Sequence, residues 1–205
     1  MYPRGGYKFS MESNTFPNLR RLDIGKLTIG RTFSLPPSLV ELRFHKCTIS
    51  PGCDLVWLEE LNPILPELRS LIISETRMTL HTVRKFLTAT PRLEVLHIDR
   101  CLDVSYSRRP EMLNVGSFRN LLELDISGTN CVTDAYIPPL IIGLTSLKVL
   151  KLCHTHVTWR TLRMLADNRG VFNLYPSLDC LFVEGCEDMS ADDIEYARTR
   201  GIEAM

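Results

Sequence analysis

Residues 121–137 of the 205-residue chain read LLELDISGTNCVTDAYI, and they hold the clearest copy of a pattern that recurs along the sequence. Its first six residues carry an apolar anchor at positions one, four and six: Leu121, Leu124 and Ile126. Apolar and polar residues alternate across the second half of this hexamer, which is typical of a short strand with one face in a core. The run VTDAYI then places an apolar residue and a polar capping residue before a further apolar segment, which predicts a helix start.

The hexamer pattern LxxLx(L/I/V/F) occurs six more times. Successive copies begin 20, 29, 25, 28, 26 and 31 residues apart. Self-similarity at a near-constant period predicts a repeat protein, because one such unit cannot bury its apolar face alone. The other anchors are Leu19-Leu22-Ile24, Leu39-Leu42-Phe44, Leu68-Leu71-Ile73, Leu93-Leu96-Ile98, Leu147-Leu150-Leu152 and Leu178-Leu181-Val183.

A small polar residue stands three positions after the last anchor in six of the seven copies. We expect these side chains to face inward and to hydrogen-bond the turning backbone, which would otherwise be unpaired. An apolar residue and then a polar helix cap follow. The inward positions are Leu27, Cys47, Thr76, Cys101, Thr129, Thr155 and Cys186. The predicted caps are Ser50, Thr79, Ser105, Thr133, Thr158 and Ser190.

Helices are predicted over LHTVRKFLTA (80–89), WRTLRMLADN (159–168) and ADDIEYARTR (191–200), whereas SLPPSLVEL (34–42) predicts a non-helical turn. We therefore expect an α/β leucine-rich-repeat solenoid, with about seven strand–helix repeats forming a curved parallel sheet with outer helices. The repeat domain spans residues 16–205 after an N-terminal extension over residues 1–15. Its first repeat lacks an evident polar cap, whereas DDIEYARTRGIEAM predicts a helix and tail that close the other end.

The charge balance gives no reason to expect a nucleic acid or an anionic membrane as partner. Basic and acidic residues both number 24, so the formal net charge is zero. No apolar stretch approaches the roughly 20 residues that span a bilayer, and MYPRGGYKFS lacks the apolar run of a secretory signal. Seven cysteines without CxxC spacing indicate reduced thiols in an intracellular, cytoplasmic or nuclear protein.

Alternation along each hexamer predicts which side chains face a partner. Positions three, five and seven point away from the core and line the concave strand face. Charged residues dominate the first two repeats, whereas later repeats add apolar side chains, as protein interfaces do. Phe182 is the best anchor because aromatic residues dominate binding hot spots, although the C-terminal tail could cover it. The candidate partner-binding residues are Arg43, His45, Ile72, His97, Asp99, Asp125, Lys151, Phe182 and Glu184.

No motif indicates an enzyme or a cofactor. Phosphate-loop, GxSxG and HExxH patterns are absent. Cys153 and His97 belong to strands two repeats apart, roughly 10 Å from each other, which is too far for one zinc ion. The carboxylate pairs Glu59-Glu60 and Asp192-Asp193 fit either solvated surface positions or a favourable placement at a helix start, and Trp57 fits a core-facing helix position. The cysteines at 47, 101 and 186 fit packing, whereas Cys131, Cys153 and Cys180 are expected to be more exposed.

The pattern LxxLxLxxC followed by (I/V)T and a helix resembles the cysteine-containing, ribonuclease-inhibitor-like leucine-rich repeat. LLELDISGTNCVTDAYI and LDCLFVEGCEDMSADDI carry this resemblance, which covers roughly residues 16–200. It implies a protein-binding module, such as the substrate receptor of a cullin-RING ubiquitin ligase, although no adaptor-binding box precedes residue 19. Alternatives are a GTPase-activating protein that uses Arg20, Arg21 or Arg43, and a structural subunit of a multi-subunit complex.

Overall fold

The hexamers form parallel strands in the computed structural model, which describes residues 8–11, 16–33, 35–49, 65–76, 80–101, 118–170 and 176–205. The chain divides into unit 1 (residues 1–93 and 101–103) and unit 2 (residues 94–100 and 104–205). Several residues singled out from the sequence lie outside the described ones: Ser50, Trp57, Glu59, Glu60, Thr79 and Ser105.

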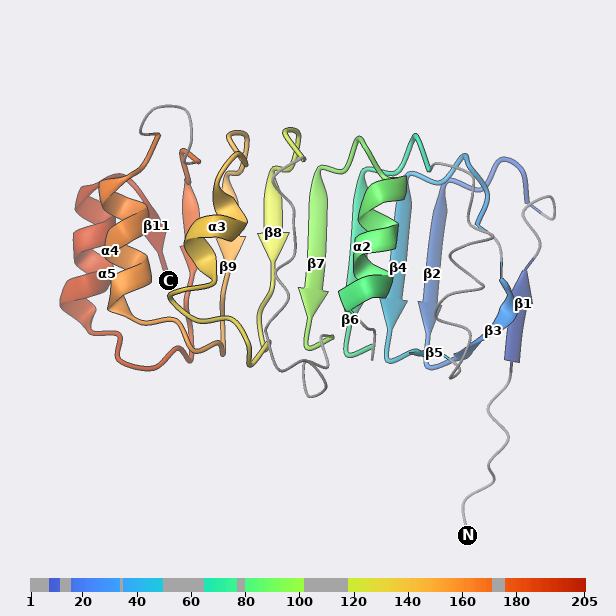
Figure 1. Cartoon of the computed structure of the whole chain (residues 1–205), viewed down its shortest axis with the longest axis horizontal. Coiled ribbons are helices and arrows are strands. Elements are labelled where there is room, and N and C mark those ends of the chain that lie inside the picture. The colour runs from blue at the N-terminus through green and yellow to red at the C-terminus, as the bar shows by residue number, and fades with distance from the viewer. Residues whose placement is uncertain are drawn as a thin grey trace, which may run out of the picture. The chain divides into compact units, whose positions relative to one another are not determined.

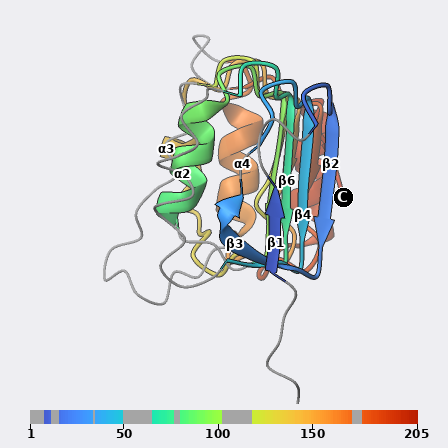
Figure 2. The ribbon, with the colours of Figure 1, turned by 90° about the vertical axis from the view of Figure 1, so that its right-hand side faces the viewer.

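Unit 1 contains parallel strands with a helix on one face. β2 (Arg21–Gly25), β4 (Glu41–His45) and β6 (Ser70–Ser74) are neighbours, with Leu22 beside Leu42 and Leu42 beside Leu71. α2 (Leu80–Ala89) lies on one face of β4 and β6 (Figure 2). A second parallel sheet joins β1 (Lys8–Met11), β3 (Thr28–Phe33) and β5 (Thr48–Ile49). The sequence analysis did not predict β1, because no hexamer precedes residue 19.

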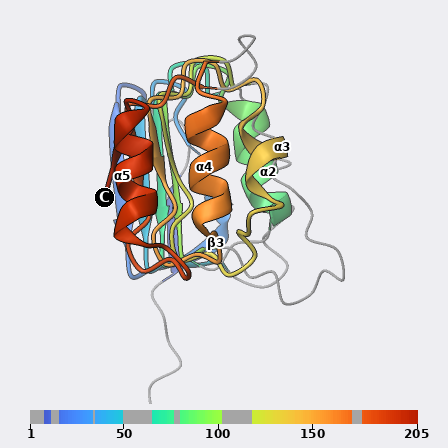
Figure 3. The ribbon, with the colours of Figure 1, turned by 90° about the vertical axis from the view of Figure 1, so that its left-hand side faces the viewer.

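Unit 2 repeats the same arrangement. Its neighbouring strands are β7 (Val95–Asp99), β8 (Glu123–Asp125), β9 (Val149–Lys151), β10 (Cys180–Phe182) and β11 (Glu203–Ala204) (Figure 1). The helices α3 (Ile137–Ile141), α4 (Trp159–Asp167) and α5 (Ala191–Thr199) cover one face (Figure 3). The expected α/β class and parallel strand pairing are confirmed.

The hexamer anchors form the core of each unit. From Leu39 onward every anchor is at most 3% exposed, which confirms their predicted inward direction. Each fully buried leucine or isoleucine contributes about 1.5–3 kcal/mol relative to an exposed one. The first repeat differs, since Leu19 and Leu22 are only half-buried although Ile24 is 3% exposed.

The small polar residues after the strands bond the backbone as predicted. The Thr76 hydroxyl accepts the Cys47 N–H at 3.1 Å and donates to the Ser74 carbonyl at 3.0 Å. Thr129 contradicts the prediction, because its buried hydroxyl has no hydrogen-bond partner among the described residues. The other bonds run from Cys47 to Ile24 O (3.2 Å), Cys101 to Ile73 O (2.9 Å), Thr155 to Leu152 O (2.6 Å) and Cys186 to Leu152 O (3.0 Å).

In each of the seven repeats, the residue two positions after the last hexamer anchor has a left-handed backbone. Within unit 2, the Gly128 N–H donates to the Cys153 carbonyl and the His154 N–H to the Glu184 carbonyl, both at 2.8 Å. These bonds pin each turn to the following repeat. The seven residues, with φ between 46° and 69°, are Lys26, Lys46, Glu75, Arg100, Gly128, His154 and Gly185.

Gly185→Ala is expected to lower the free energy of unfolding by about 1–2 kcal/mol, because φ is +69° there. A Cβ would also collide with the imidazole ring of His154. The matched control is Gly25→Ala, whose Cβ would meet only the His45 carbonyl oxygen at 3.7 Å. Urea denaturation monitored by circular dichroism compares the two, and equal losses of stability would contradict the explanation.

Polar side chains begin two of the helices as predicted. Ser190 forms a capping box with Asp193, and Thr158 accepts the Arg160 N–H. The predicted cap Thr133 is wrong, because α3 begins after Tyr136, which makes no side-chain cap. The Thr133 carbonyl instead accepts the Tyr136 N–H at 2.9 Å in a turn that delays the helix.

Candidate partner-binding strand face

The strand face of unit 2 carries a row of four side chains that were predicted to bind a partner. Strand register places His97 of β7 beside Asp125 of β8, Asp125 beside Lys151 of β9, and Lys151 beside Phe182 of β10. All four were predicted to face outward, and all four are half-buried on the sheet surface. The parallel pairing therefore brings residues from four repeats, 97 to 182 in the sequence, onto one surface.

Glu123 links this row through one carboxylate oxygen. Its Oε1 lies 2.8 Å from His97 Nε2 and 2.6 Å from Lys151 Nζ. The three side chains are between 19% and 28% exposed, so solvent screens their interactions only in part. The predicted site omitted Glu123, although the carboxylate stands one register row from both His97 and Lys151. That diagonal spacing across adjacent strands is the sequence signal that could have identified it.

The surroundings of Glu123 keep it ionised. Burial acts to raise the pKa of its carboxyl, but hydrogen bonds from Lys151 and His97 outweigh burial and hold the pKa below its ordinary value. The carboxylate therefore stays negative at neutral pH and orients both basic side chains. Such prior ordering reduces the entropy lost when a partner binds.

Phe182 ends the row at β10. The Lys151 ammonium lies 5.6 Å from the centre of its ring, which is a cation–π distance. The next strand, β11, places Glu203 beside Cys180 and Ala204 beside Leu181. The tail therefore extends the sheet by one strand, as the predicted C-terminal closure requires, and Phe182 remains half-buried. We refer to His97, Glu123, Lys151 and Phe182 as the Glu123 surface.

Three predicted carboxylates border this surface. Asp125 Oδ1 accepts the Ser127 N–H at 3.0 Å, and Asp99 Oδ1 lies 3.5 Å from Arg100 Nε. Glu184 is exposed after the end of β10. Ser127 was expected to face outward, but this is wrong, because it is only 9% exposed and its hydroxyl accepts the Cys153 N–H. The strand β8 has already ended at Asp125, so alternation no longer applies there.

Unit 1 holds the other predicted residues on its own strand face. Arg43 donates to Glu41 Oε1 from Nε at 2.6 Å, and Arg21 Nε lies 3.1 Å from Glu41 Oε2. His45 Nδ1 lies 3.0 Å from the Ser74 hydroxyl, and Ile72 is half-buried on β6. A hollow of about 300 Å³ is lined by Arg21, Leu22, Asp23, Glu41 and Arg43.

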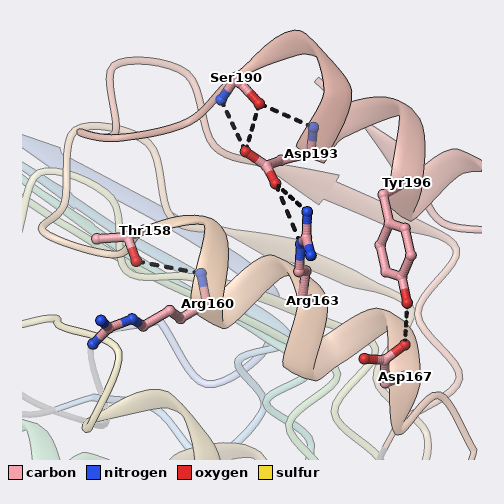
Figure 4. Close-up of polar contacts among 7 residues, drawn as sticks. All are labelled: Thr158, Arg160, Arg163, Asp167, Ser190, Asp193 and Tyr196. Carbon is pink, nitrogen blue, oxygen red and sulfur yellow. Dashed lines mark hydrogen bonds and ion pairs between the residues drawn. The ribbon is translucent and has the colours of Figure 1, made fainter.

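A second polar cluster lies on the helix side of unit 2 (Figure 4). Arg163 of α4 donates to the Asp193 carboxylate of α5 at 3.2–3.3 Å, and the Tyr196 hydroxyl donates to Asp167 at 2.6 Å. The Arg163 guanidinium also stacks between Trp159 and Tyr196, 5.3 and 5.2 Å from their ring centres. These contacts join two helices of one unit, so a packing role accounts for the cluster.

Three partly exposed thiols lie in surroundings that disfavour the thiolate form. Burial raises the pKa of Cys131, Cys153 and Cys180, and Glu203 adds to this effect at Cys180. All three are partly exposed as predicted, and the six described cysteines are free thiols. Within the described residues, no group of three His, Cys, Asp or Glu side chains could hold a metal ion, and none of the helices is long and apolar enough to span a membrane.

The chain was also compared with known proteins. No protein-family model matches the sequence, and no curated protein is significantly similar to it.

Proposed function

We propose that the chain is a non-enzymatic binding module, a leucine-rich-repeat solenoid that holds a partner protein on its strand face. The Glu123 surface is the observation that carries this proposal. It offers an aromatic anchor and a partly desolvated charge network, which are the features of interface centres. The helix-side cluster, in contrast, uses its aromatic and arginine side chains to join α4 to α5.

The GTPase-activating alternative requires one arginine that its surroundings single out. A catalytic arginine must be available to a phosphate in the transition state. Glu41 pairs with both Arg21 and Arg43, whereas Arg20 is exposed, and no motif singles out any of the three. No observation on the described residues selects a ubiquitin ligase or a particular complex, so the proposal concerns the binding surface alone.

Photo-crosslinking tests the proposal directly. A benzophenone amino acid replaces Phe182 on the strand face in one variant and Trp159 on α4 in a control variant, since Trp159 is 39% exposed. We expect partner adducts in native cells from position 182 and few from position 159. Equal adduct patterns, or adducts from position 159 alone, would refute the strand face as the binding surface.

Glu123→Gln adds a measurement of affinity for any partner captured in this way. The amide has the size of the carboxylate but removes the charge that orients His97 and Lys151. We expect a loss of about tenfold in affinity, because a partly buried charged hydrogen bond contributes about 1.5–3 kcal/mol. The control is Asp167→Asn on the helix side, and unchanged binding by both variants would count against the network.

A further inference from the structure

Among the described residues, the outer edge of β2 has no strand beside it, and the core behind this edge is partly open. β2 ends the strand order of unit 1 and pairs with β4 alone among the described residues. The Arg20 carbonyl accepts the Val40 and Glu41 N–H groups, and the Lys26 N–H donates to the His45 carbonyl. Because backbone groups alternate in direction along a strand, the N–H and C=O groups of residues 21, 23 and 25 face away from β4.

The apolar side chains of this repeat are covered less well than those of the next repeat. Leu19 and Leu22 are half-buried, whereas Leu39 and Leu42 are fully buried at the equivalent positions. Leu27 is likewise half-buried, whereas Cys47 is 3% exposed. An open strand edge together with part-exposed core leucines is the combination that favours addition of another strand.

The charges on β2 specify what such a strand must carry. On the paired side, Glu41 of β4 stands beside Arg21, and Arg43 stands beside Asp23. The Arg21 side chain is 83% exposed although its Nε lies 3.1 Å from Glu41, and no ion pair of the exposed Asp23 is found within the described residues. A strand with complementary charges would therefore place an acidic residue beside Arg21 and a basic residue beside Asp23.

We infer that the edge of β2 is a docking site for an extended segment of a partner protein, added as a parallel strand. The segment carries apolar residues beside Leu22 and Ile24, with an acidic residue beside Arg21 and a basic residue beside Asp23. This site lies in unit 1 and does not depend on the Glu123 surface of unit 2. Failure of either proposal therefore leaves the other intact.

A fluorescein-labelled peptide of the sequence SLVELRFHK, copied from residues 38–46, is the probe, because it carries the required alternation. Fluorescence anisotropy is expected to show saturable binding to the whole chain. In SLVRLEFHK the acidic and basic residues are exchanged, and this peptide is expected to bind at least fivefold more weakly. Equal binding of the two peptides, or no saturable binding of the first, would overturn the proposal.

Substitutions at Asp23 test the edge itself. Asp23→Pro removes an N–H that faces away from β4, so the pairing with β4 is retained. The proline ring also obstructs an added strand, and peptide binding is expected to fall at least tenfold. Asp23→Ala keeps the N–H and loses one exposed charge pair, so binding is expected to fall no more than about fivefold. Equal affinities of these two variants would rule out strand addition.

Two further measurements keep the test decisive. If Asp23→Pro does not fold, two peptides replace it, each N-methylated at one of the two alternate sets of residues. The backbone N–H groups of only one set can face β2, so only that peptide should lose binding. Equal binding by both peptides would contradict the proposal. Sedimentation of the unlabelled chain then identifies the occupant. A dimer that dissociates in the Asp23→Ala and Asp23→Lys variants would show that a second copy occupies the edge and would overturn the partner assignment.

Discussion

Phe44→Ala is expected to lower the free energy of unfolding by about 3–5 kcal/mol, the range for removing a fully buried aromatic side chain. Phe44 is 0% exposed in β4, and its ring centre lies 6.0 Å from that of Phe86, which is fully buried in α2. The substitution therefore leaves a cavity between strand and helix and also removes an aromatic pair. Urea denaturation monitored by circular dichroism measures the loss.

The matched control is Phe16→Ala, the same change at a side chain that is 54% exposed. We expect it to change stability by less than about 1 kcal/mol, since most of this ring already contacts water. A loss below 1 kcal/mol for Phe44→Ala would mean that the core of unit 1 repacks around the missing ring. Similar losses for the two variants would contradict the assignment of Phe44 to the core.

Asp134→Ala is expected to lower the free energy of unfolding by about 2–4 kcal/mol. Hydrogen bonds to a charged group contribute about 1.5–3 kcal/mol each, and the contributions of bonds to one carboxylate are not additive. Asp134 Oδ1 accepts the Thr158 N–H at 2.8 Å and the Thr161 hydroxyl at 2.6 Å, and Oδ2 accepts the Thr158 hydroxyl at 2.8 Å. Asp134 lies outside α4, yet it holds the residues at the start of that helix in the following repeat. Thermal unfolding followed at 222 nm compares variant and wild type.

The same residue predicts a dependence of stability on pH. Burial acts to raise the pKa of the Asp134 carboxyl, but hydrogen bonds from Thr161 and Thr158 outweigh it and hold the pKa below its ordinary value. The stabilisation is therefore complete above the unfolded-state pKa, about 3.9, and is lost as pH falls through the folded-state pKa. The difference between wild type and Asp134→Asn should shrink below about pH 4. A difference that stays constant down to pH 2 would contradict the effect.

Repeat spacing predicted the parts of the fold that depend on periodic burial. The helix predicted over residues 80–89 coincides with α2, and α4 and α5 begin at the predicted residues, because Thr158 and Ser190 signal these starts locally. Thr133 carries the same signal but does not cap a helix, since a turn follows it. A threonine at this position can cap a helix with its side chain, or it can accept a hydrogen bond in a turn with its backbone carbonyl. The residue type alone does not distinguish the two.

Features that depend on contacts between repeats were harder to predict. Strand alternation placed His97, Lys151 and Phe182 on one face, but the role of Glu123 depends on diagonal contacts across strands. The left-handed backbone positions were missed because most carry lysine, glutamate, arginine or histidine instead of the glycine that favours this conformation. A hydrogen bond from the backbone N–H to a carbonyl of the following repeat, not the residue type, holds such residues in the left-handed conformation.

Those hydrogen bonds make the connections between strands tolerant of insertion. The path from Val149 to its register partner Cys180 is five residues longer than the path from Glu123 to Val149, yet neither pairing shifts. The strand and its pinned turn set the alignment, so the extra length falls between the turn and the next strand of the sequence. Affinity tags or evolutionary insertions can therefore enter these connections, whereas one residue deleted between a strand and its turn would reverse which side chains face a partner.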